Sequence, residues 1–192
     1  SMAHSLRYEM PLAIFHTLKF SAAVSYGKPL VQPFNLRTRS SQFTGRYVWD
    51  LPTYDLVKHS ATFGFDYKTS NSDLDFSSMP VFDKKTHVVQ FLAGYNASYP
   101  DKWGRTALGL QLTLSPGGLS DENDDEAFNA YKQGASAEYY YFNLDVDRLT
   151  RLNFMPGEMV WNVKFHAQLT DDVLIGSEQM GVGGFSSVRG FE

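Results

Sequence analysis

The sequence contains no cysteine, which excludes a disulfide scaffold and a thiolate metal site. It also lacks an apolar run approaching the roughly 20 residues that a membrane-spanning helix needs. No signal peptide is visible in these 192 residues. Basic residues are not in excess, because 17 Lys and Arg stand against 21 Asp and Glu. These absences exclude a helical membrane protein and argue against nucleic acid as a main partner.

Motifs for catalysis and for cofactor binding are missing as well. The five histidines show neither helical i, i+4 spacing nor an H-x-H pair, and no G-x-S-x-G elbow occurs. The glycine-rich stretch 181–185 resembles a phosphate loop, but the residues after it are a poor helix start. The acidic run 121–126 lacks the glycine and the spacing of a calcium loop, and we interpret it as a solvated loop tip. We therefore expect no enzyme, metal, cofactor or nucleotide.

What the sequence does contain is alternation of apolar and polar residues, the signature of β-strands. Eight segments show it, most of them longer than the roughly 5–6 residues of an average strand and near the ~9–11 that a tilted strand needs to cross a bilayer. The mean hydropathy of -0.30 does not oppose a membrane barrel, because lipid-facing and lumen-facing residues average out. The segments are 2–10, 16–26, 41–51, 56–68, 87–99, 105–114, 132–144 and 158–169.

Each alternating segment predicts two faces. We expect the apolar set to face lipid: Val57, Phe63, Phe65, Phe91, Leu108, Leu110, Val163 and Phe165. We expect the polar set to face the lumen: Lys58, Gln90, Gln111, Asn162 and Lys164. A soluble β-sandwich, such as a carbohydrate-binding module, alternates in the same way, so alternation alone leaves both folds open.

The connections and the aromatic residues favour the barrel. Short links (11–15, 52–55, 100–104) alternate with long ones (27–40, 69–86, 115–131), as periplasmic turns and extracellular loops do; 145–157 is intermediate, and the last link is long from Thr170 onward. A short helix is expected over 125–133. Trp49, Tyr99, Trp103 and Trp161 lie beside the links that we interpret as periplasmic, as expected for an aromatic girdle.

Three stretches resemble a known family. Ser177-Glu178-Gln179, with Gly183-Gly184 and Ser187-Val188-Arg189-Gly190-Phe191-Glu192, resembles the S-E-Q…G-G…S-V-R-G-[YF]-E signature of two-partner secretion transporters, the hemolysin secretion/activation (ShlB/FhaC/HecB) family. The segments 64–71 and 114–119 resemble that family's G-x-D-Y-K-x-x-N and S-P-G-x-L motifs, in the family's order.

The resemblance implies an outer-membrane translocator that secretes an unfolded partner exoprotein across the outer membrane of a Gram-negative-type bacterium. Residues 1–192 would be part of an antiparallel barrel domain, about eight strands of a sixteen-stranded barrel. The domain would end in a long extracellular loop from about 170 that folds into the lumen. A barrel-assembly factor of the same superfamily is the alternative.

Within that loop, the resemblance implies a lumen motif of Gly183, Gly184, Val188, Arg189, Gly190 and Phe191. Arg189 carries a permanently charged planar fork, so it is expected to form a bidentate pair with a carboxylate on a strand beyond Glu192. The implied partners are the exoprotein and outer-membrane lipid, with no nucleic acid or nucleotide.

Overall fold

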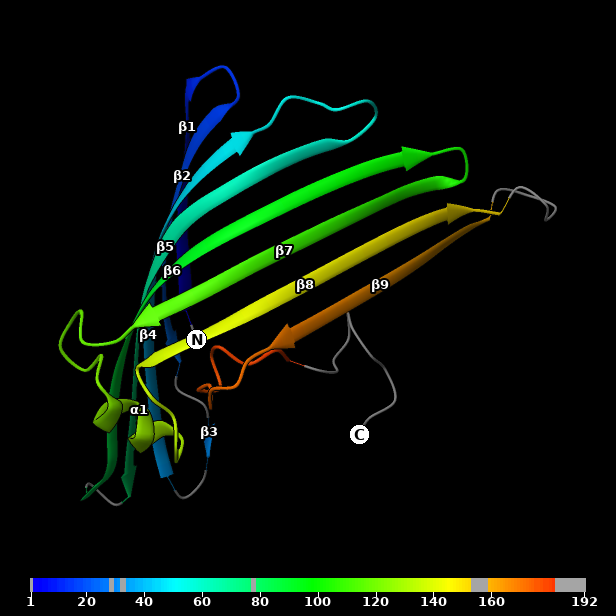
Figure 1. The fold of residues 1–192 in the computed structure, drawn as a ribbon. Coiled ribbons are helices and arrows are strands. Elements are labelled where there is room, and N and C mark those ends of the chain that lie inside the picture. Colours follow the sequence, from blue (N-terminus) through cyan, green and yellow to red (C-terminus); the bar gives the residue numbers. More distant parts are fainter. Residues whose placement is uncertain (1, 28–29, 32–33, 77–78, 153–158, 182–192) are drawn as a thin grey trace.

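The chain forms one long, curved antiparallel sheet (Figure 1). A computed structural model describes residues 2–27, 30–31, 34–76, 79–152 and 159–181. Each long strand pairs with the next one along the chain, and a two-residue strand lies beside β4. The strands are β1 (Met2–Ala13), β2 (His16–Gly27), β3 (Leu30–Val31), β4 (Phe34–Asp50), β5 (Lys58–Phe76), β6 (Met79–Asp101), β7 (Gly104–Pro116), β8 (Glu138–Arg151) and β9 (Val160–Leu169).

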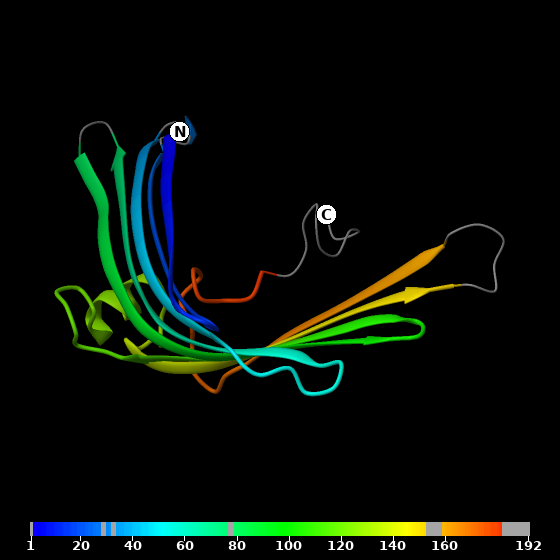
Figure 2. The ribbon, with the colours of Figure 1, turned by 90° about the horizontal axis from the view of Figure 1, so that it is seen from above.

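The sheet bends into an open trough, which is seen from above in Figure 2. The predicted all-β class and the antiparallel order are confirmed. The sandwich alternative is wrong, because every strand of the described chain belongs to the same sheet and no second sheet packs against it.

The pairing register keeps polar and apolar residues on separate faces across all strands. Because side chains alternate along a strand, directly paired residues share a face. One row across the sheet is polar: Arg7, Ser21, Thr44, Asp66 and Gln90. The adjacent row is mostly apolar: Tyr8, Phe20, Gly45, Phe65, Phe91 and Leu114.

The apolar face is the convex one, and it is exposed. Phe63, Phe91 and Phe165 are each about half exposed, at 50%, 47% and 55%. The concave face is polar, and Asp66, Gln90 and Thr113 are buried there. Large apolar side chains on the outer face and polar side chains on the inner face are typical of a sheet with lipid outside and water inside.

Several strands extend beyond the predicted bounds. The expected long links 27–40 and 69–86 are mostly strand, since β4 begins at Phe34, β5 runs on to Phe76 and β6 begins at Met79. The hydrogen-bond ladder continues there although the sequence no longer alternates. Alternation requires two different environments, so it is lost where both faces of a hairpin meet water.

The strand predicted over 132–144 is displaced toward the C-terminus and becomes β8. The preceding residues form the short helix α1 (Asp125–Tyr131), as expected. The Asp124 side chain caps it by accepting a hydrogen bond from the Ala127 amide at 2.8 Å. The Asp125 carboxylate accepts hydrogen bonds from Ser136 and the Ala137 amide, which hold the pKa of Asp125 below its usual value and fasten α1 to the start of β8. No helix in the described ranges is long and apolar enough to cross a membrane.

The two faces of β7 provide a test of orientation. Leu110 lies at the middle of the strand on the convex face, and its neighbour Gln111 lies on the concave face. We expect Leu110→Arg to destabilise the barrel by about 2–4 kcal/mol, the range for a cationic residue on the lipid face at the bilayer midplane. Gln111→Arg is the matched control, and we expect it to be tolerated because its side chain enters water.

The measurement is the urea dependence of the heat-modifiable gel mobility of the full-length barrel in lipid. Equal destabilisation by the two substitutions would contradict the assignment of the faces, and greater destabilisation by Gln111→Arg would show that the faces are reversed.

Candidate functional site

The segment that follows β9 turns back into the hollow of the sheet (Figures 1 and 2). It comprises residues 170–181, and we refer to it as the return segment. Its residues contact β5, β8 and β9 through side chains on the concave face. The concave wall and the return segment together form the candidate functional site.

The return segment is held first by a buried ion pair. Glu178, whose side chain is 1% exposed, accepts hydrogen bonds from Lys68 Nζ at 2.8 and 3.0 Å to its two oxygens. The Tyr141 hydroxyl donates to the same carboxylate at 3.2 Å, and Ser177 Oγ lies 3.1 Å from it. A carboxylate removed from water requires such partners on both oxygens, and here it has them.

Gln168 on β9 holds the main chain of the same segment. Its amide nitrogen donates to the Glu178 carbonyl at 2.9 Å, and its amide oxygen accepts from the Met180 amide at 2.9 Å. One side chain thereby pairs with the backbone as a neighbouring strand would. The segment therefore follows the wall without forming a strand of its own.

A second polar network lies beside the first. Arg46 Nη2 is 2.6 Å from Asp66 Oδ1, and Gln90 donates to Asp66 Oδ2 at 3.1 Å. The Tyr139 hydroxyl then donates to Gln90 Oε1 at 3.0 Å. Since the Tyr139 and Tyr141 rings stack with an interplanar angle of 6°, the networks around Asp66 and Glu178 are adjacent.

Gly64 allows the Arg46 side chain to lie across β5. A Cβ at Gly64 would collide with the Gly45 carbonyl and would lie 2.6 Å from Arg46 Cδ. No side chain fits between these groups, so any other residue would displace Arg46 from Asp66.

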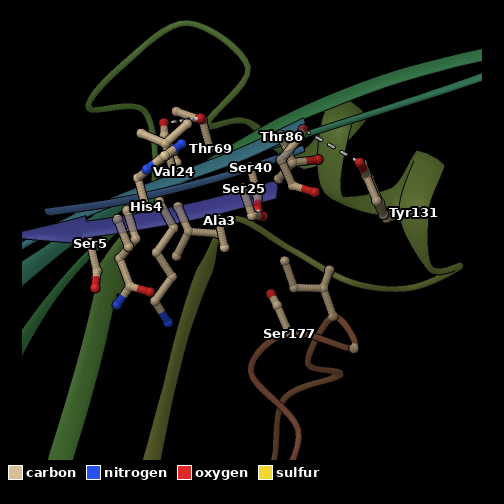
Figure 3. Close-up of a pocket in the computed structure, with 18 residues that line it drawn as sticks. Ala3, His4, Ser5, Val24, Ser25, Ser40, Thr69, Thr86, Tyr131 and Ser177 are labelled. Atoms are coloured by element: carbon tan, nitrogen blue, oxygen red, sulfur yellow. Dashed lines mark hydrogen bonds between the residues drawn. The ribbon is translucent and has the colours of Figure 1, made fainter. Parts of the chain in front are cut away.

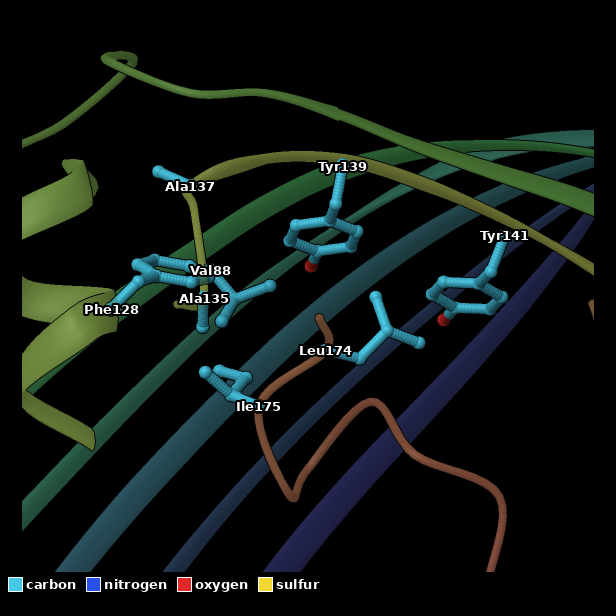
Figure 4. Packing of buried hydrophobic residues seen from close by; sticks show 8 residues of the cluster. All are labelled: Val88, Phe128, Ala135, Ala137, Tyr139, Tyr141, Leu174 and Ile175. Atoms are coloured by element: carbon cyan, nitrogen blue, oxygen red, sulfur yellow. The ribbon is translucent and has the colours of Figure 1, made fainter. Parts of the chain in front are cut away.

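A small apolar cluster joins the return segment to α1 (Figure 4). Phe128 of α1 is fully buried, and it packs among Val88, Ala135, Ala137, Tyr139, Tyr141, Leu174 and Ile175. Lys132 Nζ donates to the Leu174 carbonyl at 3.1 Å. The loop between β7 and β8 is itself fastened to β6, because the buried Asn123 side chain donates to the His87 carbonyl at 2.8 Å. The two loops thus meet over the concave face.

Of the five residues expected in the lumen, only Gln90 belongs to the polar networks around Asp66 and Glu178. The other four lie on the same concave face by register. Lys164 is mostly exposed and lies 3.9 Å from Asp147, and Asn162 is exposed. The strand pairings place Lys58 and Lys164 at opposite ends of one row of that face, with Ser98, Ala107 and Asp147 between them.

The aromatic residues expected in a girdle lie at one end of the sheet. Trp49, Tyr99, Trp103 and Trp161 are 41–60% exposed, next to the connections from β4 to β5, from β6 to β7 and from β8 to β9. Val57, expected on a strand, instead bridges to Tyr54 within a turn. The expected loop motif, Gly183, Gly184, Val188, Arg189, Gly190 and Phe191, lies outside the described residues.

Sequence reasoning missed the pairing of Lys68 with Glu178. Both residues stand in stretches that carry the family resemblance, 64–71 and 177–192. Nothing in the spacing showed that the two stretches meet, since 110 positions separate them. The contacts of Asp66, Arg46, Tyr141 and Gln168 with the two networks and the return segment were likewise not predicted from the sequence.

These features define the class of the protein. A curved antiparallel sheet with an apolar exterior, a polar interior and a loop folded into that interior is the wall of an outer-membrane β-barrel. Within the described ranges, no three His, Asp or Glu side chains gather in a way that would hold a metal.

Comparison with known proteins then identifies the family. The family model for the haemolysin secretion/activation protein ShlB/FhaC/HecB matches residues 1–192, so the chain belongs to that family of outer-membrane transporters of Gram-negative bacteria. No curated protein and no solved structure matches the chain.

The buried ion pair yields a prediction with an internal control. Lys68→Met removes the cation from a carboxylate that is almost fully buried, and breaking a fully buried pair costs on the order of 3–5 kcal/mol. Because the Lys68 side chain is 25% exposed, we expect a smaller loss, enough to release the return segment from the wall. Lys19→Met is the control, since its 3.6 Å pair with Glu9 is exposed on both sides and contributes little.

The measurement is cleavage within 170–181 by a protease added outside intact cells that contain the full-length barrel. We expect faster cleavage for Lys68→Met and no change for Lys19→Met. The charge-exchanged pair Lys68→Glu with Glu178→Lys is expected to restore part of the protection. Unchanged protection from protease in Lys68→Met would show that the ion pair between Lys68 and Glu178 does not hold the return segment against the wall.

Proposed function

We propose that this chain forms part of the wall of a translocator that passes an unfolded partner exoprotein across the outer membrane. The observation that carries the proposal is the return segment, held against a polar concave wall by Glu178 and Gln168. A polar wall suits a water-filled path, and a segment held by a few polar contacts and a small apolar cluster can be displaced from it. The membership in a secretion/activation family supports the same function.

In this proposal each face has its own role. The lumen-facing side chains are those on the concave face, including Lys58, Gln90, Gln111, Asn162 and Lys164. The convex face contacts lipid, and Trp49, Tyr99, Trp103 and Trp161 lie at the level of the periplasmic headgroups. Arg189 remains a predicted anchor of the loop inside the lumen.

Transport through such a wall uses no nucleotide in this proposal. The network residues offer hydrogen bonds and charge, but the described wall presents no phosphate-binding turn followed by a helix. Folding of the exoprotein outside the cell can supply the direction of movement. The function that we propose does not include chemical modification of the exoprotein.

Reconstitution tests this function and separates it from barrel assembly. The full-length transporter is placed in lipid vesicles, without nucleotide, and given either an unfolded exoprotein that depends on it or an unfolded small outer-membrane barrel. We expect the exoprotein to enter the vesicle, where added protease cannot reach it. We expect the small barrel to show no gain in its heat-modifiable folded form. The opposite pattern assigns the protein to barrel assembly.

The proposed orientation gives a second prediction. Residues 1–192 contain no cysteine, so they add no background to the labelling of introduced cysteines. Cysteines at Asp121 and Glu126, both exposed near α1, are expected to react with an impermeant thiol reagent on intact cells. Cysteines at Thr53 and Lys102, exposed in the opposite turns, are expected to react only after the outer membrane is opened.

The labelled positions are matched in exposure, so a difference between them reports the side of the membrane. Labelling of intact cells at positions 53 and 102, with none at 121 and 126, would show that the orientation is the reverse of the one we propose.

A further inference from the structure

A cavity of about 750 Å³ lies between the return segment and the concave wall. Its floor crosses β1, β2, β4, β5 and β6, and Ile175, Gly176 and Ser177 close it from the opposite side. Figure 3 shows Ser25, Ser40 and Thr86 together on the wall, with Ser177 facing them and Tyr131 of α1 at one side. The cavity thus lies on the polar wall and directly beneath the segment that the ion pair holds.

The wall of this cavity carries a continuous row of small side chains, mostly hydroxyls. The pairing register places them directly beside one another on successive strands, and we call this row the hydroxyl arc: Ala3, Ser25, Ser40, Ser70 and Thr86. Ser25 and Ser40 are 2.7 Å apart through their hydroxyl oxygens. Lys68 is the only lysine, arginine or carboxylate among the lining residues, and its charge is paired with Glu178.

One hydroxyl of the arc lacks a partner. Thr86 is 2% exposed, and its Oγ1 makes no hydrogen bond. A buried hydroxyl without a partner is unfavourable, so a shift of the surrounding groups that lets a passing group bond to it is favoured. Thr86 lines the cavity, but its Oγ1 is covered, so it becomes available for bonding only when its surroundings shift.

We infer that the hydroxyl arc is a contact surface for the backbone of the polypeptide in transit, an inference that rests on the proposed translocator function. A Ser or Thr hydroxyl both donates and accepts, and it rotates, so it pairs with either an amide N–H or a carbonyl of any residue. Small side chains leave room for passengers of different size, and an uncharged surface neither traps nor repels charged ones.

The geometry of the arc also prevents a tight grip. Neighbouring strands of the wall are about 4.7–4.9 Å apart, whereas an extended chain rises about 3.2–3.4 Å per residue. The hydroxyls therefore do not match successive backbone groups in a single register. Contacts form and break as the chain slides, which suits transit rather than stable binding.

Site-specific photo-crosslinking tests the inference in the full-length transporter. A photoactivatable amino acid replaces Ser25 or Ser40 in the arc, Asn162 on the concave face outside the cavity, or Phe43 on the convex face. The probe is an exoprotein that depends on the transporter and is stalled in transit by a folded domain fused to its C-terminus. Heat-modifiable gel mobility verifies that each variant has folded.

We expect crosslinks to the stalled exoprotein from Ser25 and Ser40, seen as a gel shift of its band, and none from Phe43. Crosslinks from Asn162 with none from the arc overturn the inference and leave the translocator function intact. Crosslinks from no concave position overturn both. Products that remain within the transporter chain, or equal crosslinking at Phe43, also overturn the inference.

A pair of substitutions at Thr86 tests the chemistry of the contact. Thr86→Val keeps the shape and removes the hydroxyl, whereas Thr86→Ser keeps the hydroxyl. We expect slower secretion for the Val variant, a rate near the native one for the Ser variant, and equal amounts of folded barrel for both. Equal secretion rates for the two variants overturn the contact through this hydroxyl.

Discussion

The ladder of backbone hydrogen bonds that joins each long strand to the next, from β1 to β9, is the constraint on which the rest of this structure depends. Lipid offers no partner to a backbone N–H or carbonyl, so a membrane wall made of strands must pair each strand with its neighbour. The ladder fixes the register, and the register fixes which residues share a face. A slip by one position along β5 would turn Phe65 toward the lumen and Asp66 toward lipid.

The polar interior follows from the same constraint and makes the folded-back loop possible. Every second residue of each strand points into the trough, so polar groups from strands far apart in sequence face one another there. Lys68, Tyr141 and Gln168 converge on the return segment from β5, β8 and β9. An isolated Glu178 carboxylate would be costly to bury, but Lys68 of β5 and Tyr141 of β8 supply its partners together.

The fastening of the return segment is local and specific, which suits a part that has to change place. It includes one buried ion pair, one glutamine that pairs with the main chain, a small apolar cluster shared with α1, and hydrogen bonds from Lys132 and Tyr140. An extensive apolar interface would hold the segment permanently. A buried ion pair can instead be exchanged for water when the segment leaves, because both charges are solvated again in an open lumen.

The sequence by itself determined the fold class, the sidedness of the strands and the family, because lipid on one face and water on the other impose an alternation that is legible residue by residue. It failed where that contrast ends, as in 69–86, where the strands continue in water and the sequence resembles a loop. It also identified the stretches 64–71 and 177–179 but not their contact. The tertiary structure alone decided that Lys68 meets Glu178 and that Ser25, Ser40 and Thr86 share one row, because these depend on strand register and sheet curvature, which sum over many residues.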